Sequence, residues 1–267
     1  MPVNKKRAKE FFGDIQALQD GLEFEDFFDN MQSKLSDLIS KRGELEGETL
    51  RTYIRRITRL LDPEFLGFVD KIFSSYDNTI NLVNQHYGDI GTEISRDFAK
   101  IQAIEKINLT QLGEYRDSTV RDISKIVRKG IFEGKQHTEI GKDITAIGGK
   151  VAGFGNTLAR TQVKAHGQES KMEKARLGEV FFHQYVGIIR PDITRRFCLE
   201  LRQQSDPTFH IRDIRQMRNG QISPVQTYRG GFNCHHDWEP DPFFDAEKYK
   251  VSFYSVQDGR KTLTLAR

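Results

Sequence analysis

One polar, glycine-rich stretch near the C-terminal end constrains this chain more than any other. Residues 228–240 (YRGGFNCHHDWEP) contain the only tryptophan, one of the two cysteines and two of the seven histidines. Glycine permits backbone conformations that a Cβ atom forbids, so Gly230 and Gly231 predict a sharp turn. Such a turn would hold residues 233–236, from Asn233 to His236, in a fixed position, and we expect a rigid loop here.

A second cluster lies upstream and contains the other cysteine. Residues 190–198 (RPDITRRFC) are rich in arginine and end at Cys198. Two cysteines are too few for a disulfide scaffold, so they form at most one bridge or part of one metal site. We expect the C-terminal half to fold the two clusters against each other.

Composition limits the class of protein. The 267 residues are 37% hydrophobic and 30% charged, which suits an elongated, helix-rich chain of one or two domains. The net charge of +3 is too small to indicate nucleic-acid binding without a local cluster. The basic start lacks the apolar core of a signal peptide, and no apolar run approaches the ~20 residues that span a bilayer. We therefore expect a protein of the cytosol, or of an assembly built there, with no membrane partner.

The first half has helical periodicity almost throughout. Apolar residues recur at helical spacing over residues 28–38, 50–61, 65–76 and 80–101. Asp62-Pro63 predicts a boundary between two of these helices, and glycines at 88 and 91 favour a break in the last. Asn108 is expected to cap a further helix that ends near Gly130. An extended helical bundle or hairpin is predicted over about residues 4–130.

The pattern changes after this region. Thr138 is expected to cap a short helix through Ile144, the glycines of residues 148–155 predict a flexible link, and Gly178 ends a second helix over 157–177. Strands are predicted at 180–186 and near 251–256, with a short helix at 211–218 between them. The predicted fold class is thus α+β and mostly α-helical. An elongated N-terminal helical arm (1–135) precedes a smaller C-terminal α+β domain with long loops (136–267).

Four side chains are candidates for a metal site. Thiolates and imidazoles are the usual ligands of structural zinc, and the candidates are Cys198, His210, Cys234 and either His235 or His236, with His236 preferred. Their spacing is irregular and lacks the close ligand pairs of a zinc finger. A disulfide between the cysteines, or two cysteines that only pack in the core, are the alternatives.

The sequence contains no convincing catalytic set. The run His235-His236-Asp237 would suit a metal-dependent nuclease, because histidine is a good general base near neutral pH. Such a site needs a second cluster of carboxylates or imidazoles, and none is evident. The motifs of phosphate-binding loops, zinc proteases and serine hydrolases are also missing. We do not expect an enzyme, and the alternatives to a structural protein are a metal-dependent nuclease and a zinc-stabilised DNA-binding module.

Basic residues at helical spacing are candidates for DNA contact, because such stripes can follow phosphates. One stripe lies on the predicted helix 157–177, and a denser group lies in the loop-rich segment after the first predicted strand. These DNA-binding candidates are Arg160, Lys164, Lys171, Lys174, Arg190, Arg195 and Arg196. Residues 138–144 also look like the start of a helix-turn-helix, but no recognition helix follows.

Five segments appear in an order that resembles the phage Mu F-like family of head-morphogenesis proteins, the minor head or minor capsid proteins. They are residues 126–134 with 138–144, residues 158–162 with Ala165, residues 182–186, residues 192–198 (DITRRFC) and residues 230–238 (GGFNCHHDW). The similarity covers about residues 120–242. The chain departs from the family at His235, where arginine is usual, and at Gln162, where glutamate is usual. It also lacks a second cysteine close to the first.

The resemblance implies a bacteriophage virion component, present in few copies at the portal vertex of the head and assembled in the host cytoplasm. Such a protein acts in head morphogenesis and in DNA packaging and ejection. Its expected partners are the portal protein, packaged double-stranded DNA, and scaffold or coat protein. No cofactor is expected apart from a structural zinc. The motif turn would be formed by Gly230, Gly231, Asn233 and Trp238.

Overall fold

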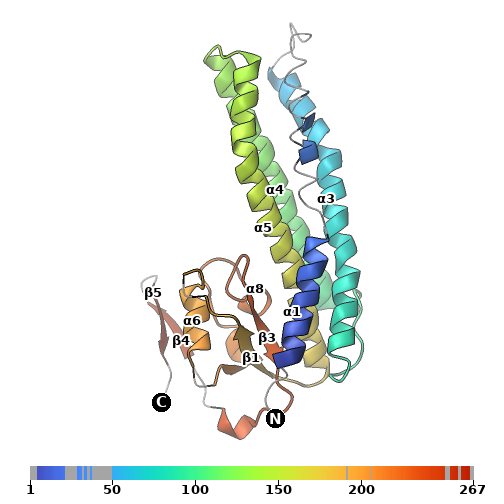
Figure 1. Ribbon diagram of the computed structural model, residues 1–267, viewed down its shortest axis with the longest axis vertical. Helices are drawn as coiled ribbons and strands as arrows, with labels where there is room; N and C mark the ends of the chain where they lie inside the picture. The colour runs from blue at the N-terminus through green and yellow to red at the C-terminus, as the bar shows by residue number, and fades with distance from the viewer. Residues whose placement is uncertain are drawn as a thin grey trace. The chain divides into compact units, whose positions relative to one another are not determined.

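The computed structural model describes residues 5–21, 29–31, 33–34, 37, 50–190, 192–204, 206–249, 253–257 and 260–264 (Figure 1). It is 67% helical and contains a small antiparallel sheet of three strands, which confirms the predicted mostly helical α+β class. The chain divides into two compact units. Unit 1 comprises the described residues of Met1–Leu18, Tyr76–Ile104 and Arg160–Arg267, and unit 2 those of Gln19–Ser75 and Glu105–Ala159.

Four long helices provide most of the structure. They are α1 (Lys5–Asp20), α3 (Leu50–His86), α4 (Ala99–Phe132) and α5 (His137–Leu177). Because α3, α4 and α5 each contribute residues to both units, the units do not divide at the predicted boundary of 135/136. The predicted break around Gly88 and Gly91 is confirmed, since α3 ends at His86 and α4 begins at Ala99.

Helix α3 corrects the predicted boundary at Asp62-Pro63. Pro63 lies inside the helix, although an interior proline removes one backbone hydrogen bond and costs roughly 3 kcal/mol. Apolar side chains on both sides of it are buried along one stripe, and this packing outweighs the local cost. The buried stripe consists of Ile57, Leu61, Phe65, Phe68 and Ile72. Of the stripe predicted over 28–38, Phe28, Leu35 and Leu38 lie outside the described residues.

Helices α4 and α5 are also longer than predicted. Asn108 is buried within α4 instead of capping it, and the glycines of residues 148–155 lie inside α5 instead of forming a link. In unit 2, a Cβ atom on Gly130 would lie 2.5 Å from Cγ1 of Ile140, so that glycine lets α4 and α5 approach closely. Isolated glycines weaken a helix by only about 1 kcal/mol each, which the packing of a long helix can offset.

The sheet of unit 1 has the strand order β2-β1-β3, with both pairs antiparallel. Strand β1 (Phe182–Gly187) confirms the predicted strand, whereas β2 (Thr208–His210) and β3 (His236–Pro240) were not predicted. Tyr185 pairs with Trp238 across β1 and β3. A hairpin of β4 (Phe253–Gln257) and β5 (Arg260–Thr264) follows, and β4 contains most of the second predicted strand.

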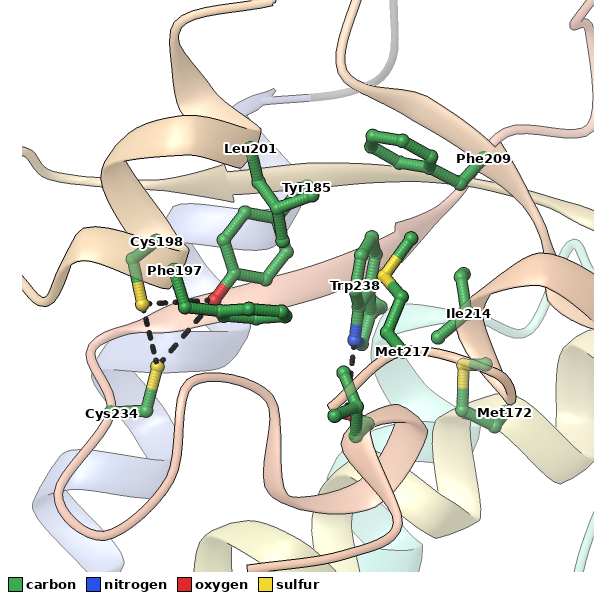
Figure 2. Close-up of a cluster of buried hydrophobic side chains, with 11 residues drawn as sticks. Met172, Tyr185, Phe197, Cys198, Leu201, Phe209, Ile214, Met217, Cys234 and Trp238 are labelled. Carbon is green, nitrogen blue, oxygen red and sulfur yellow. Dashed lines mark hydrogen bonds between the residues drawn. The ribbon is translucent and has the colours of Figure 1, made fainter. Parts of the chain in front are cut away.

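Short helices and one 3₁₀ turn connect the strands of unit 1. They are α6 (Arg196–Arg202), α7 (Ile211–Ile214), α8 (Val225–Tyr228) and η2 (Ala246–Lys248). Helix α7 is shorter than the predicted helix 211–218. Trp238 is fully buried among side chains of α5, α6, α7, α8, β1 and β2, and its indole Nε1 donates a hydrogen bond to the carbonyl of Val225 at 3.2 Å (Figure 2). One hydrophobic cluster of unit 1 therefore forms around the C-terminal motif.

Candidate functional site

The two cysteines meet in the core of unit 1. Cys198 belongs to α6 and Cys234 precedes β3, yet their sulfur atoms lie 3.9 Å apart as free, buried thiols. The hydroxyl of Tyr185 on β1 donates a hydrogen bond to Cys198 Sγ at 3.3 Å and lies 3.7 Å from Cys234 Sγ. Figure 2 shows the three side chains pointing toward one another. The expected docking of the two sequence clusters is confirmed.

His236, the first residue of β3, completes a three-residue group with the cysteines. Its Nδ1 atom lies 4.0 Å from Cys234 Sγ, and its ring stacks on Tyr185 with 5.3 Å between ring centroids. One donor atom from each of Cys198, Cys234 and His236 lies within 4.8 Å of the others. These are the types of atom that bind zinc, so the group can hold a metal ion.

The other two histidine candidates are not in this group. His210 precedes α7, where its Nδ1 atom accepts a hydrogen bond from the backbone N–H of Arg212 at 3.1 Å and caps the helix. Its predicted role as a ligand with the two cysteines is therefore wrong. His235 is exposed, and its ring lies 6.1 Å from that of Phe12 on α1. The alternation of side chains along an extended segment explains why only one of the two adjacent histidines reaches the sulfurs.

The predicted sharp turn is present and closes over the sulfur atoms. Gly231 has a φ of +102°, and Arg229 and Asn233 each have a φ of +52°, so the chain enters the left-handed region three times. A Cβ atom on Gly230 would lie 2.2 Å from Cys198 Sγ, which no side chain can accommodate. The Gly230 N–H donates to Cys234 Sγ at 3.2 Å. Only glycine at this position permits the observed turn.

An arginine fixes this turn to the arginine-rich cluster. The Arg195 guanidinium donates to the carbonyl of Gly230 at 3.2 Å and to that of Phe232 at 2.5 Å. Carbonyl groups of a tight turn have few partners within the turn, so these bonds satisfy acceptors that would otherwise need water. Arg195 is therefore a structural residue of the loop as well as a candidate for DNA contact.

The two thiols differ in acidity because they form a hydrogen bond with each other. That bond lowers the pKa of Cys234, which also receives the Gly230 N–H and lies near the His236 ring. The same bond raises the pKa of Cys198, and burial raises it further. Burial also raises the pKa of the Tyr185 hydroxyl, which therefore stays a hydrogen-bond donor to the sulfurs.

A buried group of charges lies on the other side of β3 and was not anticipated from the sequence. The Lys171 Nζ atom on α5 lies 2.6 Å from Asp237 Oδ2 and 3.6 Å from Glu239 Oε2. Glu239 also accepts hydrogen bonds from the Tyr87 hydroxyl at 2.7 Å and from Arg7 Nε at 3.3 Å. Burial raises the pKa of the Glu239 carboxyl, while the Lys171 charge opposes that rise. The group ties α1, α5 and Tyr87, the residue after α3, to the sheet within unit 1.

This group corrects the predicted basic stripe on α5. Lys164, Lys171 and Lys174 are buried, and Arg160 is half-buried, so the stripe does not form a solvated face for DNA. Lys174 Nζ donates to the Thr92 carbonyl at 3.0 Å. Burial and the Arg229 charge lower the pKa of Lys164 to about 8. The helical spacing was correctly recognised, but residues 161–175 of α5 are all buried, so the stripe does not form a solvated face.

The loop arginines are more accessible. Arg190 and Arg196 are exposed, although Arg196 also pairs with Glu200 in the next turn of α6 at 2.5 Å. A pocket of about 360 Å³ is lined by Arg190 and reaches the three donor residues. Its basic lining residues are Lys9, Arg190, Arg195, Arg202 and His235. The pocket is therefore lined by basic residues. The thiols of Cys198 and Cys234 and the imidazole of His236 also line it.

Comparisons of this chain with family models, curated proteins and solved structures find no match. Within the described part of the chain, no helix combines the length and apolar character needed to cross a membrane.

Proposed function

We propose that this chain is a structural minor head protein of a bacteriophage, a low-copy virion component at the portal vertex. It would act in head morphogenesis and in DNA packaging and ejection. One observation carries the proposal: four of the five segments that resemble the Mu F-like family, although far apart in the sequence, contribute residues that pack together in unit 1. Cys198 meets Cys234, and Arg195 bonds the Gly230 carbonyl.

Further contacts join two more of the segments to this centre, whereas residues 126–134 and 138–144 belong to unit 2. Thr161 Oγ1 on α5 accepts a hydrogen bond from the Asn233 backbone at 3.3 Å, and Tyr185 on β1 contacts both sulfurs. Residues of separate motifs thus share one core. A set of motifs that depend on one another for packing supports a common fold more strongly than motifs scattered over the surface would.

The polar residues around this core favour a structural role over hydrolysis. The Asp237 carboxylate accepts from Lys171 Nζ at 2.6 Å and from the Trp238 backbone at 3.0 Å, so its charge is already compensated. His236 is buried against Tyr185. A general base must reach its substrate with a free lone pair, and within the run His235-His236-Asp237 only His235 is exposed. One exposed histidine supports a structural role better than the nuclease alternative.

DNA contact is assigned to the loop arginines instead of the stripe on α5. Arg190 and Arg196 are exposed, and each phosphate contact that they make would add salt-dependent affinity. The double variant Arg190→Ala/Arg196→Ala should bind double-stranded DNA more weakly and with a shallower salt dependence, by up to about 0.9 per lost contact in the log–log slope. Arg121→Ala, at an exposed position on α4, is the matched control.

The direct test of the proposal is association with the portal. The full chain is co-produced with the portal protein encoded in the same phage genome and is analysed by size-exclusion chromatography at moderate salt. Co-elution of the chain with the portal, and not with coat protein produced alone, is expected. Separate elution of the folded chain and the portal in every condition would count against the proposal.

A further inference from the structure

The arrangement of Cys198, Cys234 and His236 has nearly the dimensions of a zinc site. Zinc binds cysteine sulfur at about 2.3 Å and imidazole nitrogen at about 2.0–2.1 Å in tetrahedral geometry, which places such ligand atoms about 3.5–3.8 Å apart. The two sulfurs are 3.9 Å apart, and Cys234 Sγ lies 4.0 Å from His236 Nδ1. For these two pairs, shifts of a few tenths of an ångström would reach coordination distance, and all three atoms lie within 4.8 Å of one another.

Each of the three residues is positioned by its own structural element. Cys198 belongs to α6, Cys234 to the glycine turn and His236 to β3, which pairs with β1. The Gly230 N–H and the Tyr185 hydroxyl donate to the sulfurs, as donors do around coordinated thiolates. A ligand set that is already placed by the fold loses little entropy when it binds an ion.

The buried imidazole supports the same conclusion. His236 is 4% exposed, and its Nε2 atom has no hydrogen-bond partner within the described part of the chain. Among the described residues, the other ring nitrogen, Nδ1, contacts Cys234 Sγ, a weak hydrogen-bond partner, at 4.0 Å. A buried polar ring with so few polar contacts costs stability, and coordination of an ion through Nδ1 would compensate for that cost.

Three protein ligands leave one position of a tetrahedral ion open. Among the described residues, no fourth cysteine, histidine or carboxylate joins the three donors. All three line the 360 Å³ pocket, whose other lining residues include Arg190, Arg195 and Arg202. An ion bound here would therefore face solvent on the pocket side, where the guanidinium groups favour an anionic fourth ligand.

We propose that Cys198, Cys234 and His236 bind one Zn²⁺ ion, with the fourth coordination position open to the arginine-lined pocket. Binding releases the two thiol protons to solvent and leaves a neutral unit of one dication and two thiolates. The proposal does not depend on the role at the portal vertex, since it concerns only the chemistry of three residues in unit 1.

The test uses the full chain, purified under reducing conditions and then titrated with Zn²⁺ and Co²⁺. One equivalent of zinc is expected by elemental analysis, and the Co²⁺ form should show the near-ultraviolet sulfur-to-metal bands and visible bands of a tetrahedral dithiolate site. Adding thiocyanate should shift the visible bands, because the fourth position is open. Failure of the fully reduced chain to bind either metal would overturn the proposal, and unchanged visible bands would overturn the open position.

Variants assign the ligands. Cys198→Ser and His236→Asn should each lower zinc affinity by at least tenfold, whereas His210→Asn should bind zinc as the wild type does. Loss of zinc from His210→Asn alone would contradict the assignment. Circular dichroism checks that each variant is folded, and the Co²⁺ spectrum of the wild type remains decisive if a variant is not. A Cys198–Cys234 disulfide that persists after reduction would equally refute the site.

Discussion

Replacement of Lys171 by methionine tests whether the buried charges hold unit 1 together. The Lys171 side chain is fully buried, and it lies 2.6 Å from Asp237 and 3.6 Å from Glu239, whose side chains are 9% and 0% exposed. Methionine has a similar length but no charge, so two buried carboxylates would lose their shared cation. Breaking a buried ion pair in this way typically costs about 3–5 kcal/mol.

The remaining contacts decide where in that range the cost falls. Glu239 would keep Arg7 and Tyr87, and Asp237 would keep Arg229 at 3.9 Å. These partners should limit the loss of unfolding free energy to the lower half of the range, roughly 3–4 kcal/mol. The double variant Lys171→Met/Asp237→Asn should recover part of the loss, because one of the uncompensated charges is then gone.

The assay is urea unfolding at neutral pH, followed by the fluorescence of Trp238, which is the only tryptophan and lies between the two carboxylates in β3. Lys6→Met is the matched control, since Lys6 is 85% exposed and 3.8 Å from Glu10. Exposed pairs contribute at most about 1 kcal/mol. A Lys171→Met chain as stable as the Lys6→Met chain would refute the structural importance assigned to the cluster.

Four further predictions concern individual positions. Burial lowers the pKa of His183 to about 3, below its unfolded value, so the stability that the neutral ring contributes is present above pH 6.5 and is lost as pH falls. Between pH 7.5 and 5, urea titrations should show that the wild type loses about 2 kcal/mol more unfolding free energy than His183→Leu does. Equal losses in the two chains would contradict this prediction. Gly178→Ala would place a Cβ atom 2.8 Å from the Gly91 backbone nitrogen and should cost about 1–3 kcal/mol. Gly113→Ala meets nothing within 4 Å and should instead stabilise by about 0.5–1 kcal/mol in thermal unfolding. The fluorescence of the buried Trp238 should resist acrylamide quenching until unit 1 unfolds, and easy quenching in the native state would refute its placement.

The sequence predicted the helical content and the meeting of the two cysteines, because both depend on local signals. Apolar periodicity indicates helices, and the Gly230-Gly231 pair indicates the turn that carries Cys234. The sequence-based prediction of helix ends was wrong at Pro63 and at the glycines of residues 148–155. There, packing along α3 and α5 outweighs the local preference of these residues to break a helix. Propensity describes one segment at a time, whereas these helices are stabilised by their neighbours.

The candidate site could be predicted only in part, for a related reason. Helical spacing identified one face of α5, but spacing cannot distinguish a solvated basic face from one whose lysines are buried beside carboxylates. The partners of Lys171 are Asp237 and Glu239, which lie two residues apart in β3 and therefore on one side of the strand. The spacing of these two carboxylates could have indicated one charged side of a strand. It was not used because residues 236–240 were interpreted as part of a turn.

The role at the portal vertex is tested most directly by counting copies of the chain in particles. Virions and procapsids of the phage that encodes it are purified, and the chain, the portal protein and the coat protein are quantified by mass spectrometry with labelled peptide standards. The chain should be present in both kinds of particle at far fewer copies than the coat protein, and labelled antibody should mark a single vertex. Its absence from particles that contain the portal would contradict the proposed function.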